Sequence, residues 1–149
     1  MSRTRHRSPV QLGRLRRWSV YLVGTGLWLT GTLWLVYHYY MTRKTLFGTE
    51  PNPLEQWWLQ LHGLFGFASL WTIGLLWGVH VLAGWRSRQR RWTGTILFSL
   101  LLILIASGYL IYYPPSDESL GLIVKIHWII GLGTALVFLI HRFVARTKR

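Results

Sequence analysis

Cysteine is absent from this sequence of 149 residues. Its absence excludes disulfides, thiolate metal ligands, cysteine nucleophiles and the C-x-x-C-H attachment of a c-type haem. Any cofactor must therefore be held by other side chains.

Acidic residues are also scarce, with four Asp and Glu against 17 Lys and Arg, so the formal net charge is +13. Clustered arginines can neutralise nucleic-acid phosphates. Here they flank hydrophobic segments at regular intervals, as membrane topology and anionic lipid headgroups require. We therefore predict a membrane environment and no nucleic-acid partner.

Long hydrophobic segments are the main feature of the chain, which is 51% hydrophobic and contains ten Trp. Four segments reach the ~20 residues that a membrane-spanning helix needs. They cover residues 18–41, 55–84, 93–113 and 120–143. The predicted fold is all-α, a bundle of four transmembrane helices.

The charges predict the orientation of these helices, because Lys and Arg near helix ends are retained in the cytoplasm. Arginines precede the first helix, fill the second connection and end the chain, whereas every acidic residue falls in the first or third connection or, for Glu55, at the helix start that adjoins the first. Both termini are therefore expected in the cytoplasm, in a multi-pass protein of the bacterial inner membrane. We divide the chain into a basic tail (1–17), a transmembrane domain (18–145) and a basic C-terminal tail (146–149).

Histidines recur in two of the predicted helices. His62 and His80 are 18 residues apart, and His127 and His141 are 14 apart. These spacings correspond to about five turns and to about 40° less than four turns, so each pair shares one helix face. The two helices run parallel, which makes His62 level with His127 and His80 level with His141. A histidine in hydrocarbon usually faces the bundle interior or a cofactor.

Two levels of facing imidazoles match the needs of two stacked haems. Haem iron takes axial ligands from both sides of a planar ring, and facing helices of a bundle can supply them. With both axial positions filled by protein, the remaining chemistry is electron transfer. We predict two non-covalent b haems, with His62, His127, His80 and His141 as the metal ligands.

The histidines that begin each pair are followed by a repeated pattern, HxxxGxx[ST]. It gives His62, Gly66 and Ser69 in one helix and His127, Gly131 and Thr134 in the other. Gly66 and Gly131 either allow a macrocycle to approach the backbone or allow helices to pack closely. Ser69 and Thr134 either contact the cofactor or bond to their own helix backbone.

The segments HGLFGFASLWTIGLLWGVHV and HWIIGLGTALVFLIH resemble the paired histidine helices of small four-helix dihaem membrane cytochromes b, which are related in plan to the cytochrome b of bc complexes. The resemblance implies that the second and fourth helices each supply one ligand to each haem. It also implies a respiratory electron-transfer subunit, rather than a stand-alone enzyme, working between the quinone pool and an outer-side c-type cytochrome or another redox subunit.

One departure from that family concerns the second helix, whose histidine spacing is four residues longer than that of the fourth. Either this helix tilts or bends to absorb the difference, for which Gly74 and Gly78 give an opportunity, or His80 is not a ligand.

Four other side chains are candidates for the cofactor sites. His38 ends the first helix, level with His62, and either binds a haem propionate, borders a quinone, replaces a ligand or has no partner. Propionates need cationic partners, which we expect to be Lys125 outside and Arg86 or Arg142 inside. Topology alone also explains both arginines.

Two other functions are compatible with the same histidines. One is that of a non-haem membrane protein that binds or transports a metal ion through them, because transition metals accept imidazole. The predicted helices contain no acidic residue along such a path, apart from Glu55 at one end. The other function is that of a structural anchor for a redox complex, without cofactors.

Overall fold

The computed structural model describes residues 13–46, 48–86 and 91–143. Four helical spans in it are long and apolar enough to cross a membrane, which confirms the predicted number of spans within this part of the chain. Most of the basic N-terminal tail, the whole C-terminal tail and residues 87–90 of the second connection lie outside the described residues. The spans are α1 (Arg14–Tyr40), α2 (Pro53–Leu76) continued by a π-helical turn η1 (Trp77–Val81) and α3 (Leu82–Arg86), α4 (Arg91–Tyr112) and α5 (Asp117–Phe143).

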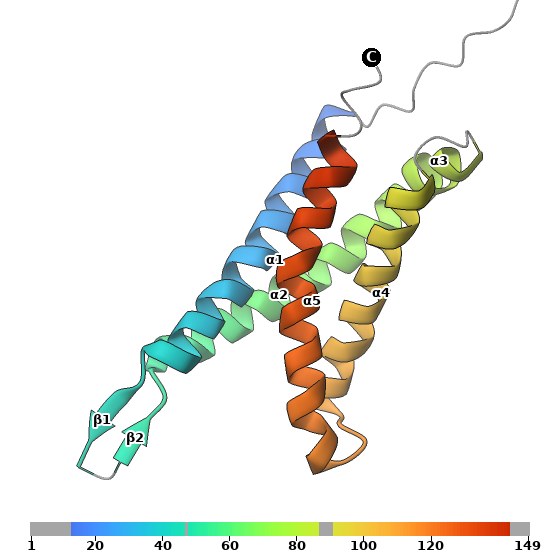
Figure 1. Ribbon diagram of the computed structural model, residues 1–149. Coiled ribbons are helices and arrows are strands. Elements are labelled where there is room, and N and C mark those ends of the chain that lie inside the picture. Colours follow the sequence, from blue (N-terminus) through green and yellow to red (C-terminus); the bar gives the residue numbers. More distant parts are fainter. Residues whose placement is uncertain (1–12, 47, 87–90, 144–149) are drawn as a thin grey trace, which may run out of the picture.

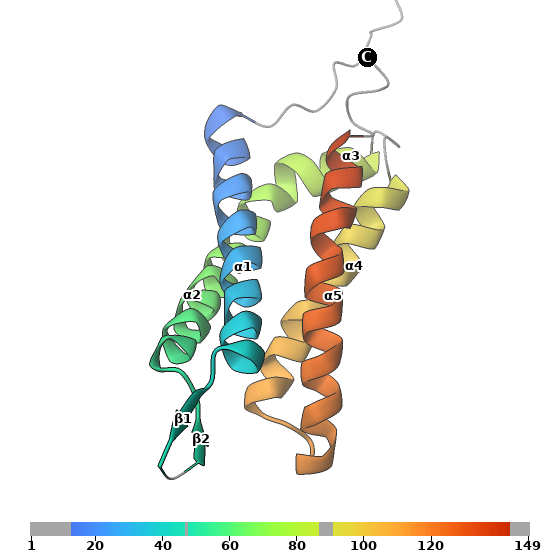
Figure 2. The same cartoon turned by 60° about the vertical axis from the view of Figure 1, so that its left-hand side comes forward.

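The spans form two helix pairs. α1 packs along α2 and α4 packs along α5, whereas α1 and α5 touch more sparsely. The start of α1, the end of α5 and α3 lie at one end of the bundle, and the loop between α4 and α5 lies at the other (Figures 1 and 2). We call these the terminal end and the hairpin end. The cytoplasmic location of the terminal end remains a prediction.

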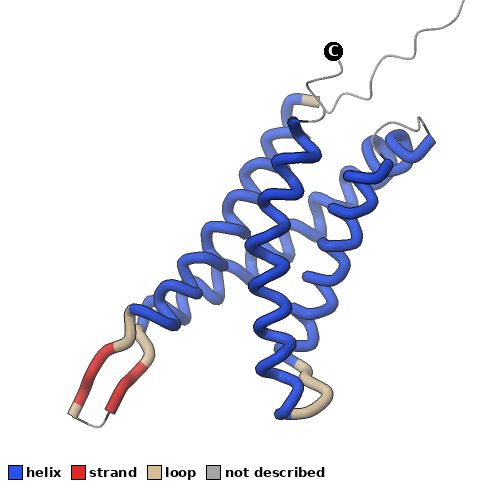
Figure 3. Tube along the Cα trace, in the orientation of Figure 1, coloured by secondary structure: helices blue, strands red, loops and turns tan. Residues whose placement is uncertain are grey.

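A β-hairpin projects from the first connection (Figure 3). Its strands β1 (Arg43–Thr45) and β2 (Gly48–Glu50) pair antiparallel, with Arg43 opposite Glu50. Gly48 has a φ of 125°, a conformation that favours glycine. The sequence analysis did not predict these strands, because a hairpin this short and fully exposed has no hydrophobic alternation.

Asn52 fixes the start of α2. Its side-chain oxygen accepts a hydrogen bond from the Leu54 amide at 3.0 Å, and its amide nitrogen donates to the Met41 carbonyl at 3.2 Å. Pro53 follows as the first helical residue, where its missing N–H costs nothing. The cap therefore ties the beginning of α2 to the end of α1, which sets the level of His62 in the bundle.

The described residues bury very little apolar side chain. Val23 is their only buried hydrophobic residue, and none of their large side chains is fully buried. Their buried polar residues are Thr30, Thr72 and Ser107. Large apolar side chains instead point outward along all four spans, as hydrocarbon surroundings favour.

Candidate functional site

Two histidines from different helix pairs face each other in the half of the bundle nearer the hairpin end. His62 comes from α2 and His127 from α5. Their ring centroids are 6.2 Å apart and their ring planes cross at 86°. We call this arrangement the hairpin-end pair. The structure therefore brings together the two side chains that the helix topology predicted to be level.

The orientation of His62 is set by α1. Its Nδ1 lies 3.0 Å from the Leu27 carbonyl and 3.3 Å from the Thr30 hydroxyl. The Thr30 hydroxyl itself lies 2.7 Å from the Gly26 carbonyl, to which it donates. Because a carbonyl only accepts, the short contact with Leu27 assigns the proton of this imidazole to Nδ1, and Nε2 keeps its lone pair.

The orientation of His127 is set by α4 in the same way. Its Nδ1 lies 2.8 Å from the Ser107 hydroxyl, which is 2.7 Å from the Ile103 carbonyl. Ser107 donates its hydroxyl proton to that carbonyl, so the Ser107 oxygen accepts from Nδ1–H of His127. Nε2 of His127 therefore also presents a lone pair.

The second pair lies toward the terminal end and consists of His80 and His141. Its ring centroids are also 6.2 Å apart, and the planes cross at 90°. His141 comes from the last turn of α5, and its Nδ1 lies 2.9 Å from the Thr93 hydroxyl of α4. We call this the terminal-end pair. His80, whose spacing left its role open, is opposite His141 after all.

His80 belongs to the π-helical turn η1 rather than to a regular α-helix. A π-turn closes its hydrogen bond one residue later than an α-turn, and such turns are frequent at functional sites. The expected adjustment of the second helix thus occurs at Trp77–Val81, a segment that contains Gly78. Trp77 packs against Phe98 of α4 at a centroid distance of 5.6 Å, which holds this turn against the other helix pair.

The spacing within each pair fits a metal held between two imidazoles. Metal–imidazole bonds are about 2.0–2.1 Å long. A nitrogen lies about 1.1 Å from its ring centre, given ring bonds of about 1.33 Å. A collinear imidazole–metal–imidazole unit thus separates the ring centres by about 6.3 Å. Both histidine pairs match this value at 6.2 Å.

A hydroxyl–glycine dipeptide stands against three of the four histidines, and the sequence analysis did not recognise this pattern. A Cβ added to the glycine would lie near the Cε1 atom of the histidine in each case. The distance would be 2.8 Å for Gly31 and His62, 3.5 Å for Gly108 and His127, and 3.7 Å for Gly94 and His141. The preceding hydroxyl contacts Nδ1 of that same histidine. The dipeptides are Thr30–Gly31 against His62, Ser107–Gly108 against His127 and Thr93–Gly94 against His141.

The HxxxGxx[ST] pattern contributes less to the histidine contacts than its repetition suggests. The Ser69 hydroxyl donates to the Gly66 carbonyl at 2.7 Å, and the Thr134 hydroxyl donates to the Ile130 carbonyl at 2.7 Å. Of the two possibilities, contact with the cofactor or a bond to the helix backbone, the structure shows the bond to the backbone for both hydroxyls. A Cβ on Gly66 would meet nothing within 4 Å, which leaves room beside this glycine for another group.

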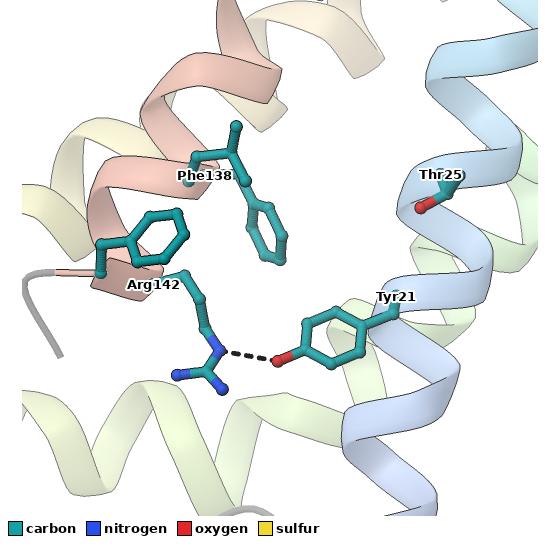
Figure 4. A pocket seen from close by; sticks show the side chains of 6 residues that line it. Tyr21, Thr25, Phe138 and Arg142 are labelled. Carbon is teal, nitrogen blue, oxygen red and sulfur yellow. Dashed lines mark hydrogen bonds between the residues drawn. The ribbon is translucent and has the colours of Figure 1, made fainter. Parts of the chain in front are cut away.

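The remaining candidate residues either contact other side chains or are exposed. His38 Nδ1 is 2.7 Å from Glu55 Oε1, and its ring stacks on Trp34 at 4.8 Å. Arg142 Nε donates to the Tyr21 hydroxyl at 2.6 Å (Figure 4). Lys125 on α5 and Arg86 at the end of α3 are exposed.

Comparison of the chain with protein families, with curated proteins and with solved structures finds no match. Within the described residues, no three His, Cys, Asp or Glu side chains gather into a group that could hold a metal ion. The described residues therefore contain two separate pairs of imidazoles, one at each level of the bundle.

Proposed function

We propose that the chain is a membrane b-type cytochrome that holds two haems, one between His62 and His127 and one between His80 and His141, and transfers electrons across the membrane. The observation that carries this proposal is the 6.2 Å separation of the imidazole rings in both pairs. This separation matches a single metal between two axial nitrogens, and it occurs at two levels of the bundle.

The number of ligands favours haem over a bare metal ion. Zinc and similar ions take four or more ligands in protein sites, whereas each pair supplies two imidazoles. A haem brings four equatorial nitrogens of its own and needs only the two axial ones. The scarcity of fully buried large side chains in the described bundle also suits an interior that is filled by a large cofactor.

The hydrogen bonds to Nδ1 give the protein control over the axial ligands. An Nδ1–H that donates to a hydroxyl or carbonyl fixes the imidazole tautomer, directs Nε2 to the metal and raises its basicity. Bound haem supplies reversible one-electron chemistry at iron. Because each pair would supply both protein ligands to its haem, oxygen or a substrate would find no open ligand position there.

The proposal includes the location and the partners that follow from charge and family resemblance. The chain would lie in a bacterial inner membrane with both termini in the cytoplasm, as its arginine distribution favours. It would exchange electrons with the quinone pool and with an outer-side c-type cytochrome or another redox subunit. This role is that of an electron-transfer subunit.

The test is the haem content of the full chain purified in detergent. A pyridine haemochrome assay should find two b haems per chain, with a b-type reduced-minus-oxidised spectrum. The two imidazole planes of each pair are nearly perpendicular, so they would interact equally with the two iron dπ orbitals. The ferric protein should therefore give a strongly anisotropic low-spin electron paramagnetic resonance signal. His38→Ala is the matched control and should retain both haems. A chain without b-type absorption after haem supplementation would refute the proposal.

A further inference from the structure

A pocket of about 280 Å³ lies between α1 and α5 near the terminal end (Figure 4). Aromatic and aliphatic groups form most of its wall, and one guanidinium enters it. Phe138 meets Tyr21 edge to face at 6.4 Å. The residues that line the pocket are Tyr21, Thr25, Phe138, Leu139, Arg142 and Phe143.

Arg142 has a polar partner here but no carboxylate. Its Nε donates to the Tyr21 hydroxyl at 2.6 Å, which holds the guanidinium in place and leaves the Nη groups as donors. Among the described residues, the terminal end has no acidic side chain, because all four Asp and Glu of the chain belong to the hairpin-end connections and first helical turns. No Asp or Glu side chain of the chain is therefore placed to pair with Arg142.

On α1 the pocket lies opposite the contact with His62, whereas on α5 it adjoins the face that carries His141. Tyr21 precedes Thr30 by nine residues, or about two and a half turns, so it occupies the side of α1 opposite the contact with His62. On α5, Arg142 is rotated by about 100° from His141 and Phe138 by about 60°. Leu139 and Phe143 are 47% and 56% exposed, as expected of side chains that contact acyl chains.

We infer that this pocket binds an anionic phospholipid. The guanidinium takes the phosphate through its Nη donors, in the bidentate geometry that arginine offers to phosphate. The Tyr21 hydroxyl, which accepts from Nε, can donate its own proton to the same headgroup. An acyl chain packs on Phe138, Leu139 and Phe143. Basic pockets between transmembrane helices on the cytoplasmic side suit anionic headgroups in this way.

The test compares two lipids with identical acyl chains, phosphatidylglycerol and phosphatidylcholine, added to the full chain in detergent. Phosphatidylglycerol should remain bound in native mass spectrometry and raise the unfolding temperature more than phosphatidylcholine. Arg142→Gln should weaken phosphatidylglycerol binding about tenfold or more, as expected for the loss of a charged hydrogen bond. Arg16→Gln, which removes an exposed charge at the same end, should leave the binding unchanged.

Several results would overturn the inference. These are equal binding of the two lipids, equal loss in both arginine variants, or the same stabilisation by inorganic phosphate, which would indicate a simple anion effect. Haem loss in Arg142→Gln with unchanged lipid binding would instead assign Arg142 to a haem propionate. If Arg142→Gln fails to fold, Tyr21→Phe can replace it in this test, because this substitution keeps the charge of Arg142. It should weaken phosphatidylglycerol binding by a smaller factor, and no change would count against the site.

Discussion

The hairpin-end and terminal-end histidine pairs reach the same ring separation on different backbones. His62 and His127 lie on regular stretches of α2 and α5, whereas His80 lies in the π-helical turn η1. Both pairs nevertheless have a centroid distance of 6.2 Å and nearly perpendicular planes. The geometry of a pair therefore does not depend on a regular α-helical spacing between its ligands.

The pairs also differ in how closely a neighbouring glycine approaches the ring. A Cβ on Gly31 would lie 2.8 Å from Cε1 of His62, whereas a Cβ on Gly94 would lie 3.7 Å from Cε1 of His141. The first distance is a clash and the second is ordinary contact. α1 thus holds the ring of His62 more tightly than α4 holds the rings of His127 and His141.

Removal of one ligand from each pair should give the largest effect. His127→Ala should lose the haem of the hairpin-end pair and keep the other, and His141→Ala should do the reverse, because each haem needs both axial nitrogens. Pyridine haemochrome assays and redox titration would show one haem per chain, with a different midpoint potential in each variant. Loss of both haems, or of neither, in a folded variant would contradict the assignment of independent pairs.

Alanine substitutions at Gly31 and Gly94 should have the next largest effect, and this effect should differ between the two histidine pairs. Gly31→Ala should displace the His62 ring and release the hairpin-end haem, since overpacking costs about 1–3 kcal/mol. Gly94→Ala should keep both haems. Gly24→Ala is the control on α1, where an added Cβ meets nothing within 4 Å. Haem content and thermal unfolding would check this, and equal effects at Gly31 and Gly94 would remove the proposed difference in tightness.

Loss of a hydroxyl partner should produce a smaller effect at the corresponding pair. Ser107→Ala leaves Nδ1–H of His127 without its acceptor, and Thr93→Val removes the hydroxyl that contacts His141. Loss of such a partner weakens metal binding by about 10–100-fold. A less basic imidazole also stabilises ferric iron less, so the midpoint potential of the affected haem should rise. Haem release to an acceptor apoprotein and potentiometry would test whether each substitution affects only its own pair.

Substitutions at the two hydroxyls of the HxxxGxx[ST] pattern should have the smallest effect. Ser69→Ala and Thr134→Val remove only bonds to the Gly66 and Ile130 carbonyls of their own helices. Haem content, spectrum and potentials should match those of the unmodified chain. A shift of one haem's potential comparable with that of Ser107→Ala would show that these hydroxyls reach the cofactor.

Helical spacing predicted the histidine pairs, but the sequence did not predict which hydroxyls contact their rings. Four spans and the two histidine pairings follow from hydrophobic length, helical spacing and parallel direction, and the structure agrees with both. The repeated pattern beside His62 and His127 drew attention to hydroxyls on the same helices as the ligands. The hydroxyls that contact the rings, including Thr30 and Ser107, lie on α1 and α4.

Hydroxyl–glycine dipeptides are visible in the sequence, but their partners are not. Thr25–Gly26 has the same form as Thr30–Gly31, and a Cβ on Gly26 would meet Phe65 rather than a histidine. Which dipeptide meets a ring depends on the rotation and level of one helix against another. Those quantities come from packing between spans and leave no local periodicity to read.

The sequence by itself determined that the chain has four apolar spans and which histidines share a level, because both depend on length, composition and helical period. Only the tertiary structure decided how the rings are held, that a π-helical turn carries His80, and that Arg142 meets Tyr21 beside a pocket. Each of these depends on contacts between spans that are distant in the sequence. Such contacts are set by the relative rotation of whole helices.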